Sequence, residues 1–185
     1  ADLRDPENID SVYYVTAHEM AHQWWGHQVG AANVQGSQVI SESLSQYAAL
    51  LVVEEKYGEA KLREFLRREL DSYLRGRSSE RLEEMPFMRA EGQQYIHYNK
   101  GSVVLMALKD AIGAPRMDQN LKNFLEEFRF KANPYPTTLD LVRHLKQDLT
   151  DAEQALVDEL FSTIQLYDLR LLKVAKKELP NDMLE

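Results

Sequence analysis

The sequence has no cysteine, which excludes disulfide bonds and cysteine-ligated metal sites. Any metal ligand must therefore be His, Asp or Glu. A basic excess is also lacking, because 22 Lys and Arg against 30 Asp and Glu give a formal net charge of −8. The clustered basic residues of "KLREFLRREL" (61–70) alternate with glutamates, as on a solvated helix face. A nucleic-acid partner is disfavoured, since phosphate binding requires a basic stripe.

Long hydrophobic runs are absent too. The longest, "YAALLVV" (47–53) and "VVLMAL" (103–108), are far shorter than the roughly 20 residues of a membrane span. The N-terminus lacks the basic-then-apolar pattern of a signal peptide. The chain as given is expected to be soluble. Its 185 residues, 44% hydrophobic, suffice for one domain with a sizeable core.

The hydrophobic pattern is helical almost throughout, which predicts an all-α helical bundle. Caps, glycines and prolines divide it into seven expected helices, at about 10–25, 39–57, 59–75, 98–113, 115–132, 138–149 and 151–166. The tail "YDLRLLKVAKKEL" fits neither the helix nor the strand period, and an extended segment is expected there. We expect a single domain over 1–185, with a helical lobe at about 9–166 and the start of a following segment at 167–185.

The first helix is expected to bury one apolar stripe. Its members are Tyr13, Ala17, Met20, Ala21 and Trp24. Tyr14, His18 and His22 lie beside it, which would place the histidines at the edge of the buried face. Trp24 and Trp25 are expected in the core and in a pocket wall.

The segment "AHEMAHQWWGH" (17–27) contains the spacing HExxH. Residues four apart on a helix lie one above the other, so His18 and His22 can point at one metal ion. Glu19, beside the first histidine, can then act on a bound water. The alternative is a helix with two ordinary histidines, because the pattern also arises by chance.

Two histidines and a water leave a tetrahedral zinc one protein ligand short. Glu42 is the leading candidate for the third ligand, since the helix that it opens can return antiparallel to the first. Glu54 and Glu55 lie about three turns further along and cannot reach the site if Glu42 does. The alternative for Glu42 is a first-turn glutamate favoured by the helix dipole.

Three features together resemble the zinc aminopeptidases of the aminopeptidase N type. They are "HEMAHQWWG", a glutamate about twenty residues later with Tyr47 five residues beyond it, and "YNKG" (98–101). These are gluzincins, which bind zinc through two His and one Glu. The segments "HQWWGHQV", "ANVQG", "SESLSQYAAL" and "YIHYNKG" look more like a bacterial branch fused to transporter-like membrane proteins. That resemblance implies a parent protein in the bacterial inner membrane.

The resemblance implies Zn²⁺ as cofactor, with His18, His22 and Glu42 as ligands. It also makes Glu19 the general base and Tyr98 the residue that stabilises the oxyanion. This sequence departs from the family's usual pattern in two ways. The usual spacing of eighteen residues between the second histidine and the glutamate would select Ser41, a poor zinc ligand, and the usual "NEGFA" is replaced by "SESLSQ".

The expected function is zinc-dependent hydrolysis of peptide substrates, as an aminopeptidase. The family's "GxMEN"-type motif, which sets amino-end specificity, is not found here. We therefore expect a part of a larger catalytic domain that binds zinc with little activity of its own. Two alternatives stay open: a non-catalytic zinc module of a bacterial membrane transport protein, and a thermolysin-like endopeptidase. His27 and His97 are candidates near the site, whereas His144 is expected to be structural.

Overall fold

The computed structural model describes residues 9–164, and within this range the chain forms helices and no strand. This confirms the all-α prediction. The seven α-helices are α1 (Ile9–Ala21), α2 (Leu44–Tyr57), α3 (Glu59–Ser79), α4 (Gly101–Ile112), α5 (Ala114–Phe128), α6 (Thr138–Leu145) and α7 (Asp151–Ser162). Three shorter elements lie between them: the π-helical turns η2 (Val39–Ser43) and η4 (Tyr95–Lys100), and the 3-10 turn η3 (Phe87–Arg89). The expected extended tail lies outside the described residues.

The first helix is shorter than predicted, because it ends at Ala21 rather than near Trp25. The chain continues as turns, in which the Gly26 amide donates to the Val29 carbonyl at 3.0 Å. Gly26 has a φ of 122°, a region that only glycine enters without strain. The chain therefore leaves the helix four residues before the predicted end and reverses at Gly26, and Trp25 is buried against Phe124, with ring centroids 6.4 Å apart.

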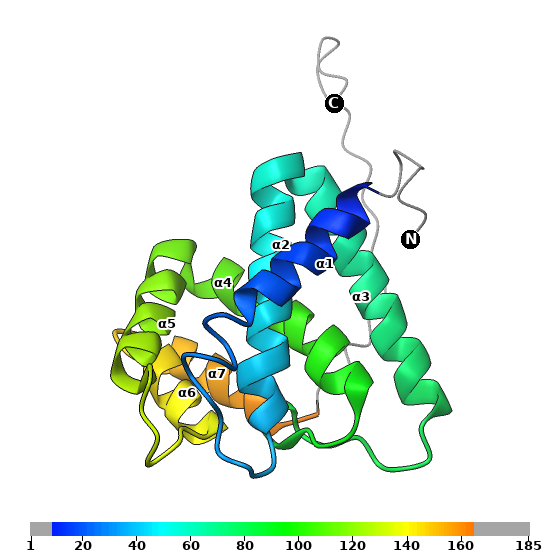
Figure 1. Cartoon of the computed structure of the whole chain (residues 1–185). Helices are drawn as coiled ribbons and strands as arrows, with labels where there is room; N and C mark the ends of the chain where they lie inside the picture. Colours follow the sequence, from blue (N-terminus) through cyan, green and yellow to red (C-terminus); the bar gives the residue numbers. More distant parts are fainter. Residues whose placement is uncertain (1–8, 165–185) are drawn as a thin grey trace, which may run out of the picture.

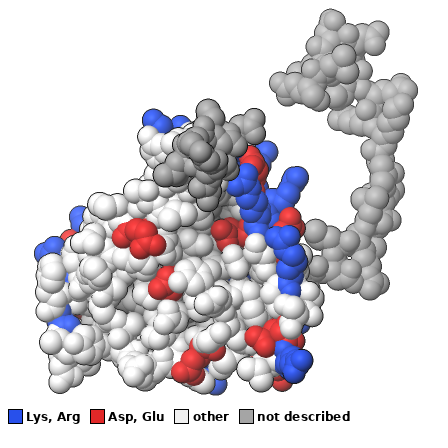
Figure 2. Space-filling view, turned by 45° about the vertical axis from the view of Figure 1, so that its right-hand side comes forward, with Lys and Arg blue, Asp and Glu red and all other residues white. Residues whose placement is uncertain are grey.

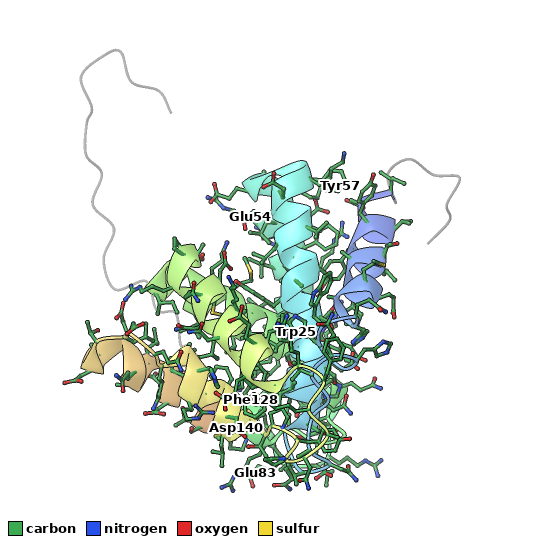
Figure 3. The ribbon with its side chains drawn as sticks, turned by 60° about the vertical axis from the view of Figure 1, so that its left-hand side comes forward. Trp25, Glu54, Tyr57, Glu83, Phe128 and Asp140 are labelled. Atoms are coloured by element: carbon green, nitrogen blue, oxygen red, sulfur yellow. The ribbon has the colours of Figure 1, made fainter. Side chains whose placement is uncertain are left out.

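Helices α1 and α2 pack side by side and antiparallel (Figure 1). At one end, the Tyr13 ring of α1 lies 5.7 Å from the ring of Tyr57. Figure 3 labels Tyr57 at the end of α2. At the other end, His18 approaches Glu42, which precedes α2. The antiparallel return expected from the sequence therefore brings the end of α1 beside the residues that precede α2.

The core is built around α2 and α4, and α5, α6 and α7 lie together at one side of it (Figure 1). Fully buried apolar side chains come from every part of this arrangement; the largest include Phe87, Phe124, Phe161, Ile40, Leu44, Leu50, Ile96 and Leu105. The starts of α6 and α7 are fixed by capping boxes, Thr137 with Asp140 and Thr150 with Glu153. These local signals explain why both short helices begin where the sequence predicts.

The buried face of α1 is not the predicted apolar stripe. Tyr13, Met20 and Trp24 are 41%, 56% and 44% exposed, and of the stripe Ala21 alone is fully buried. The prediction was wrong because polar partners set the rotation of this helix. Asp10 pairs with Lys61 of α3, Tyr14 donates to a buried glutamate of α3, and the histidines face Glu42. Of the two histidines, His18 is buried within this face, whereas His22 is partly exposed, as predicted for a residue at its edge.

The outward face of α3 carries alternating charges. Arg63 pairs with Glu59 at 2.5 Å, and Arg68 pairs with Glu64. The face in Figure 2 shows basic side chains in a narrow column with acidic groups beside them, and most of that face carries neither.

None of the described helices is long and apolar enough to span a bilayer.

Candidate metal centre

His18 and His22 lie in the last turn of α1 and directly after it. The His22 amide donates to the His18 carbonyl at 3.3 Å, so one helical turn separates the residues. Their Nε2 atoms are 3.1 Å apart and the rings stand at 88° to each other. His18 is 8% exposed. The end of the helix thus directs both ring nitrogens at one small, sheltered volume.

Glu42 reaches the same volume from η2. Its Oε2 lies 3.4 Å from Nε2 of His18 and 3.6 Å from Nε2 of His22. A hydrogen bond with His18 lowers the pKa of the Glu42 carboxyl, which is therefore ionised at neutral pH. Across residues 9–164, these three residues form the one cluster of three or more His, Cys, Asp or Glu whose ligand atoms all lie within 4.8 Å of one another.

The three atoms have the spacing and chemistry that zinc requires. Tetrahedral ligands about 2.0–2.1 Å from zinc lie roughly 3.3–3.4 Å from one another. The separations here are 3.1, 3.4 and 3.6 Å. Nδ1 of His22 faces the Trp25 carbonyl oxygen at 3.0 Å. Because this oxygen only accepts, Nδ1 carries the ring proton and Nε2 presents its lone pair to the site.

Ser45 also touches the His22 ring, and the sequence reasoning missed it. Its Oγ lies 3.1 Å from Nδ1 of His22, on the side of the ring away from Glu42. A second contact to Nδ1 restricts rotation of the ring, as outer partners of metal ligands commonly do. The available signal was its position three residues after Glu42, on the same side of a helix.

Tyr98 lies over the site from η4. Its ring centroid is 6.0 Å from that of His18, and its hydroxyl is close enough to the Glu42 carboxylate for each group to shift the pKa of the other. Burial and the adjacent Glu42 charge raise the pKa of Tyr98 to about 12. The hydroxyl is therefore protonated at neutral pH and serves as a hydrogen-bond donor.

Glu19 lies next to the three-residue cluster but is not part of it. It follows His18 in the chain and its side chain is exposed to solvent. Its negative charge contributes to the raised pKa of Tyr98, although less than burial and Glu42 do. The exposed Glu19 carboxylate and the protonated Tyr98 hydroxyl thus lie within electrostatic range of each other near the site.

The other three histidines differ in burial and in their distance from the site. His97 is 4% exposed and its ring lies 4.7 Å from that of Tyr98, so it packs under the site; burial lowers its pKa. His27 is exposed. His144 is buried, with Nδ1 at 2.8 Å from the Asp140 carbonyl and Nε2 at 3.0 Å from Glu127. Its contacts link α6 to α5, as expected of a structural histidine.

Glu42 and Tyr98 both stand on π-helical turns, η2 and η4. Such turns are rare and occur frequently at functional sites. Ser43 joins them, because its hydroxyl donates to the His97 carbonyl at 2.5 Å. A Cβ on Gly101 would lie 2.5 Å from the Ser43 hydroxyl, so only glycine permits this approach. Sequence periodicity does not predict either turn.

The far end of η4 is held by a buried ionic cluster. Nζ of Lys100 lies 2.5 Å from Glu84, and Arg77 and Tyr73 of α3 donate to the same carboxylate at 2.6 and 3.0 Å. Burial alone would raise the pKa of Glu84, but the hydrogen bonds from Lys100 and Arg77 lower it below its usual value. Glu84 thereby ties the turn that carries Tyr98 to α3.

Comparison with known families matches residues 2–164 to the peptidase family M1 domain. Among curated relatives, endoplasmic reticulum aminopeptidase 2 of Homo sapiens is 27% identical over 123 residues, covering 63% of this chain and 13% of that protein. Putative aminopeptidase-2 of Caenorhabditis elegans is 25% identical over 126 residues, covering 66% of this chain and 7% of the relative.

Solved structures of an M1 zinc metallopeptidase from Deinococcus radiodurans are similar to this fold. A mutant bound to a Tyr-ser-ala substrate superposes with a TM-score of 0.64 and 25% identity. The enzyme without that mutation gives a TM-score of 0.62 at the same identity. Each match covers 83% of this chain and 34% of the solved chain. The present chain thus spans about a third of these structures and a smaller share of the curated relatives.

Replacing Glu84 with Gln should destabilise the chain in a pH-dependent way. The variant leaves Lys100 and Arg77 without their anionic partner, which should lower the free energy of unfolding by about 2 kcal/mol at pH 7. Because the pKa of Glu84 is lower in the folded state, its contribution is complete above the ordinary value of 4.5 and is lost as the pH falls through the folded-state pKa.

Urea unfolding of both proteins between pH 7 and pH 3 measures this difference. Exposed Glu91, seven residues further along, provides the control; its change to Gln should alter stability by less than about 0.5 kcal/mol. A gap between wild type and Glu84→Gln that stays constant down to pH 3 would contradict the assignment.

Proposed function

This chain belongs to peptidase family M1, and from that premise we propose that it carries the zinc centre of a metallopeptidase that hydrolyses peptide bonds, most simply as an aminopeptidase. The observation that carries the proposal is the convergence of His18, His22 and Glu42 within one ligand-sized volume. The relatives are named as aminopeptidases and zinc metallopeptidases, which supports the substrate class and the metal.

His18 and His22 would hold zinc through Nε2, and Glu42 through a carboxylate oxygen. When bound, zinc acts as a Lewis acid that lowers the pKa of a coordinated water to about 7. Two neutral imidazoles and one carboxylate leave one position of a tetrahedral ion open, which is the arrangement of a catalytic rather than a structural site. This ligand set therefore supports an enzyme over a non-catalytic module.

Glu19 would act as the general base. It is adjacent to His18 but outside the ligand cluster, so its carboxylate is free to take a proton from the attacking water. Its exposure to solvent fits a residue that meets the substrate. Proton transfer by a positioned side chain typically contributes a factor of about 10²–10⁴ in rate.

Tyr98 would stabilise the negative charge that develops on the scissile carbonyl oxygen. The raised pKa of its hydroxyl, about 12, keeps the proton in place, so the group donates a hydrogen bond rather than repelling the oxyanion. The Glu42 carboxylate that contributes to this shift lies nearby, and the hydroxyl would donate instead to a substrate oxygen when peptide is bound. One preorganised donor of this kind contributes about 3 kcal/mol to transition-state stabilisation.

Removal of the third ligand should abolish tight zinc binding. Purified wild type is expected to contain one zinc per chain, and Glu42→Ala should lose most of it, because two imidazoles alone hold the ion weakly. Metal analysis after dialysis measures both. Glu55→Ala provides the control, since this exposed glutamate lies in the last turn of α2, at the end of the helix away from the site, and should leave zinc unchanged. Wild type without zinc, or a Glu42→Ala protein that retains it, would refute the ligand assignment.

Glu19→Gln should separate zinc binding from catalysis. The variant keeps all three ligands and should retain zinc, while hydrolysis of aminoacyl reporter substrates by the natural protein falls at least about 10²-fold. Equal activity in the variant would exclude Glu19 as base. No turnover in the wild type would favour the non-catalytic module, and cleavage of N-terminally blocked peptides would favour an endopeptidase.

We propose further that the natural protein resides in the bacterial inner membrane. The support is the resemblance of "HQWWGHQV" and "YIHYNKG" to the membrane-fused branch. Residues 9–164 contribute no spanning helix to it. Fractionation of source cells, followed with an antibody to this chain, should recover the natural protein with the inner membrane after a carbonate wash. Recovery in the soluble fraction would overturn this location.

A further inference from the structure

Glu69 is a buried carboxylate on a helix whose other two glutamates, Glu59 and Glu64, are exposed. It lies on α3 and is 8% exposed, in the inward stripe that also contains Leu62, Phe65 and Tyr73. An apolar residue is the usual occupant of such a position, since burying a charge is costly unless it is compensated. Its presence here calls for a compensating interaction.

The hydrogen-bond partners of Glu69 are both neutral. Tyr14 Oη donates to it at 2.9 Å and Asn99 Nδ2 at 2.6 Å. Burial raises the pKa of Glu69 despite these two hydrogen bonds. Glu84, by contrast, is paired with Lys100 and Arg77. Among the described residues, no Lys or Arg forms an ion pair with Glu69, so its negative charge lacks a cationic side chain beside it.

Both hydrogen-bond partners of Glu69 lie on elements that also carry residues of the candidate metal centre. Tyr14 lies one helical turn before His18 on α1, and Asn99 follows Tyr98 on η4. A positive charge on His18 would lower the pKa of Glu69, which places the two groups within electrostatic range of each other. Nδ1 of His18 is itself buried and has no hydrogen-bond partner among the described residues. Glu69 thus connects the two elements that meet over the ligand cluster.

An occupied site would be positively charged, and because solvent screens the exposed Glu19 carboxylate, a buried anion nearby would stabilise that charge more effectively. A divalent ion with two neutral imidazoles and the Glu42 carboxylate has a net charge of +1 in a partly buried volume. Direct carboxylate partners commonly balance such ligands. His22 has the Trp25 carbonyl beside its outer nitrogen, but His18 has no such acceptor.

We propose that Glu69 is a positioning residue of the metal centre: its carboxylate balances the charge of the bound cation, and through Tyr14 and Asn99 it fixes His18 and Tyr98 relative to each other. This inference rests on the proposed zinc site. It predicts that ionised Glu69 lowers the free energy of unfolding of the metal-free chain and that binding of the ion offsets this loss.

Glu69→Gln isolates the charge, because the amide can keep both hydrogen bonds. Its Oε1 can accept from Asn99 while its Nε2 donates to the Tyr14 oxygen. A raised folded-state pKa means that ionised Glu69 disfavours folding at neutral pH, so the neutral amide should not lower the unfolding temperature of the metal-free chain. The same change should weaken zinc binding about tenfold, the usual effect of losing an outer partner.

Zinc affinity of the whole chain, measured by competition with a chromophoric chelator, tests the proposal together with thermal unfolding of the metal-free proteins. Asp71→Asn is the matched control, since it removes one negative charge from the exposed face of the same helix and should leave affinity within twofold. Glu69→Asp keeps the charge with a shorter side chain and should bind zinc more tightly than Glu69→Gln.

The outcomes separate the two levels of inference. If wild type binds no zinc, the proposed function and the role of Glu69 both fail. If wild type binds zinc and Glu69→Gln binds equally well, the role of Glu69 alone fails. A Glu69→Gln protein with a lower unfolding temperature and unchanged affinity would show a purely structural residue, and an Asp variant as weak as Gln would refute the charge balance.

Discussion

The structure depends on the convergence of three electron-pair donors, two imidazole nitrogens and one carboxylate, within 3.1 to 3.6 Å of one another. Such groups do not gather in a sheltered site unless a proton or a cation lies between them, because each loses hydration there. The antiparallel pairing of α1 and α2 places the histidines against η2, and η4 closes over them. The contacts that pack these elements together are therefore the same contacts that form the site.

The sequence predicted most helices because their signals are local. Capping boxes at Thr137 and Thr150 fixed two starts, and Gly58 and Gly113 ended α2 and α4. The rotation of α1 was not predictable in this way. Hydrophobicity favoured burying Met20 and Trp24, but long-range polar contacts turned that face to solvent. Periodicity within one helix contains no information about such partners.

In the candidate site, too, the features with local signals were predictable and the long-range contacts were not. HExxH placed His18, Glu19 and His22 on one helix turn from spacing alone, and Glu42 followed from the expected antiparallel return. The family's usual spacing would have selected Ser41, yet the carboxylate that reaches the histidines is that of Glu42, on a π-helical turn. Ser45 and Glu69 escaped prediction because their relation to the site exists only once separate helices pack. A glutamate in the inward stripe of α3 was the one available sign.

The central claim is that one zinc ion joins α1 to η2 in this chain. Anomalous diffraction from crystals of the zinc-loaded protein, recorded on both sides of the zinc absorption edge, tests it most directly. The account predicts a single strong peak about 2.0–2.2 Å from Nε2 of His18, Nε2 of His22 and a carboxylate oxygen of Glu42. A peak bound by other residues, or none at this cluster in crystals that contain zinc, would contradict it.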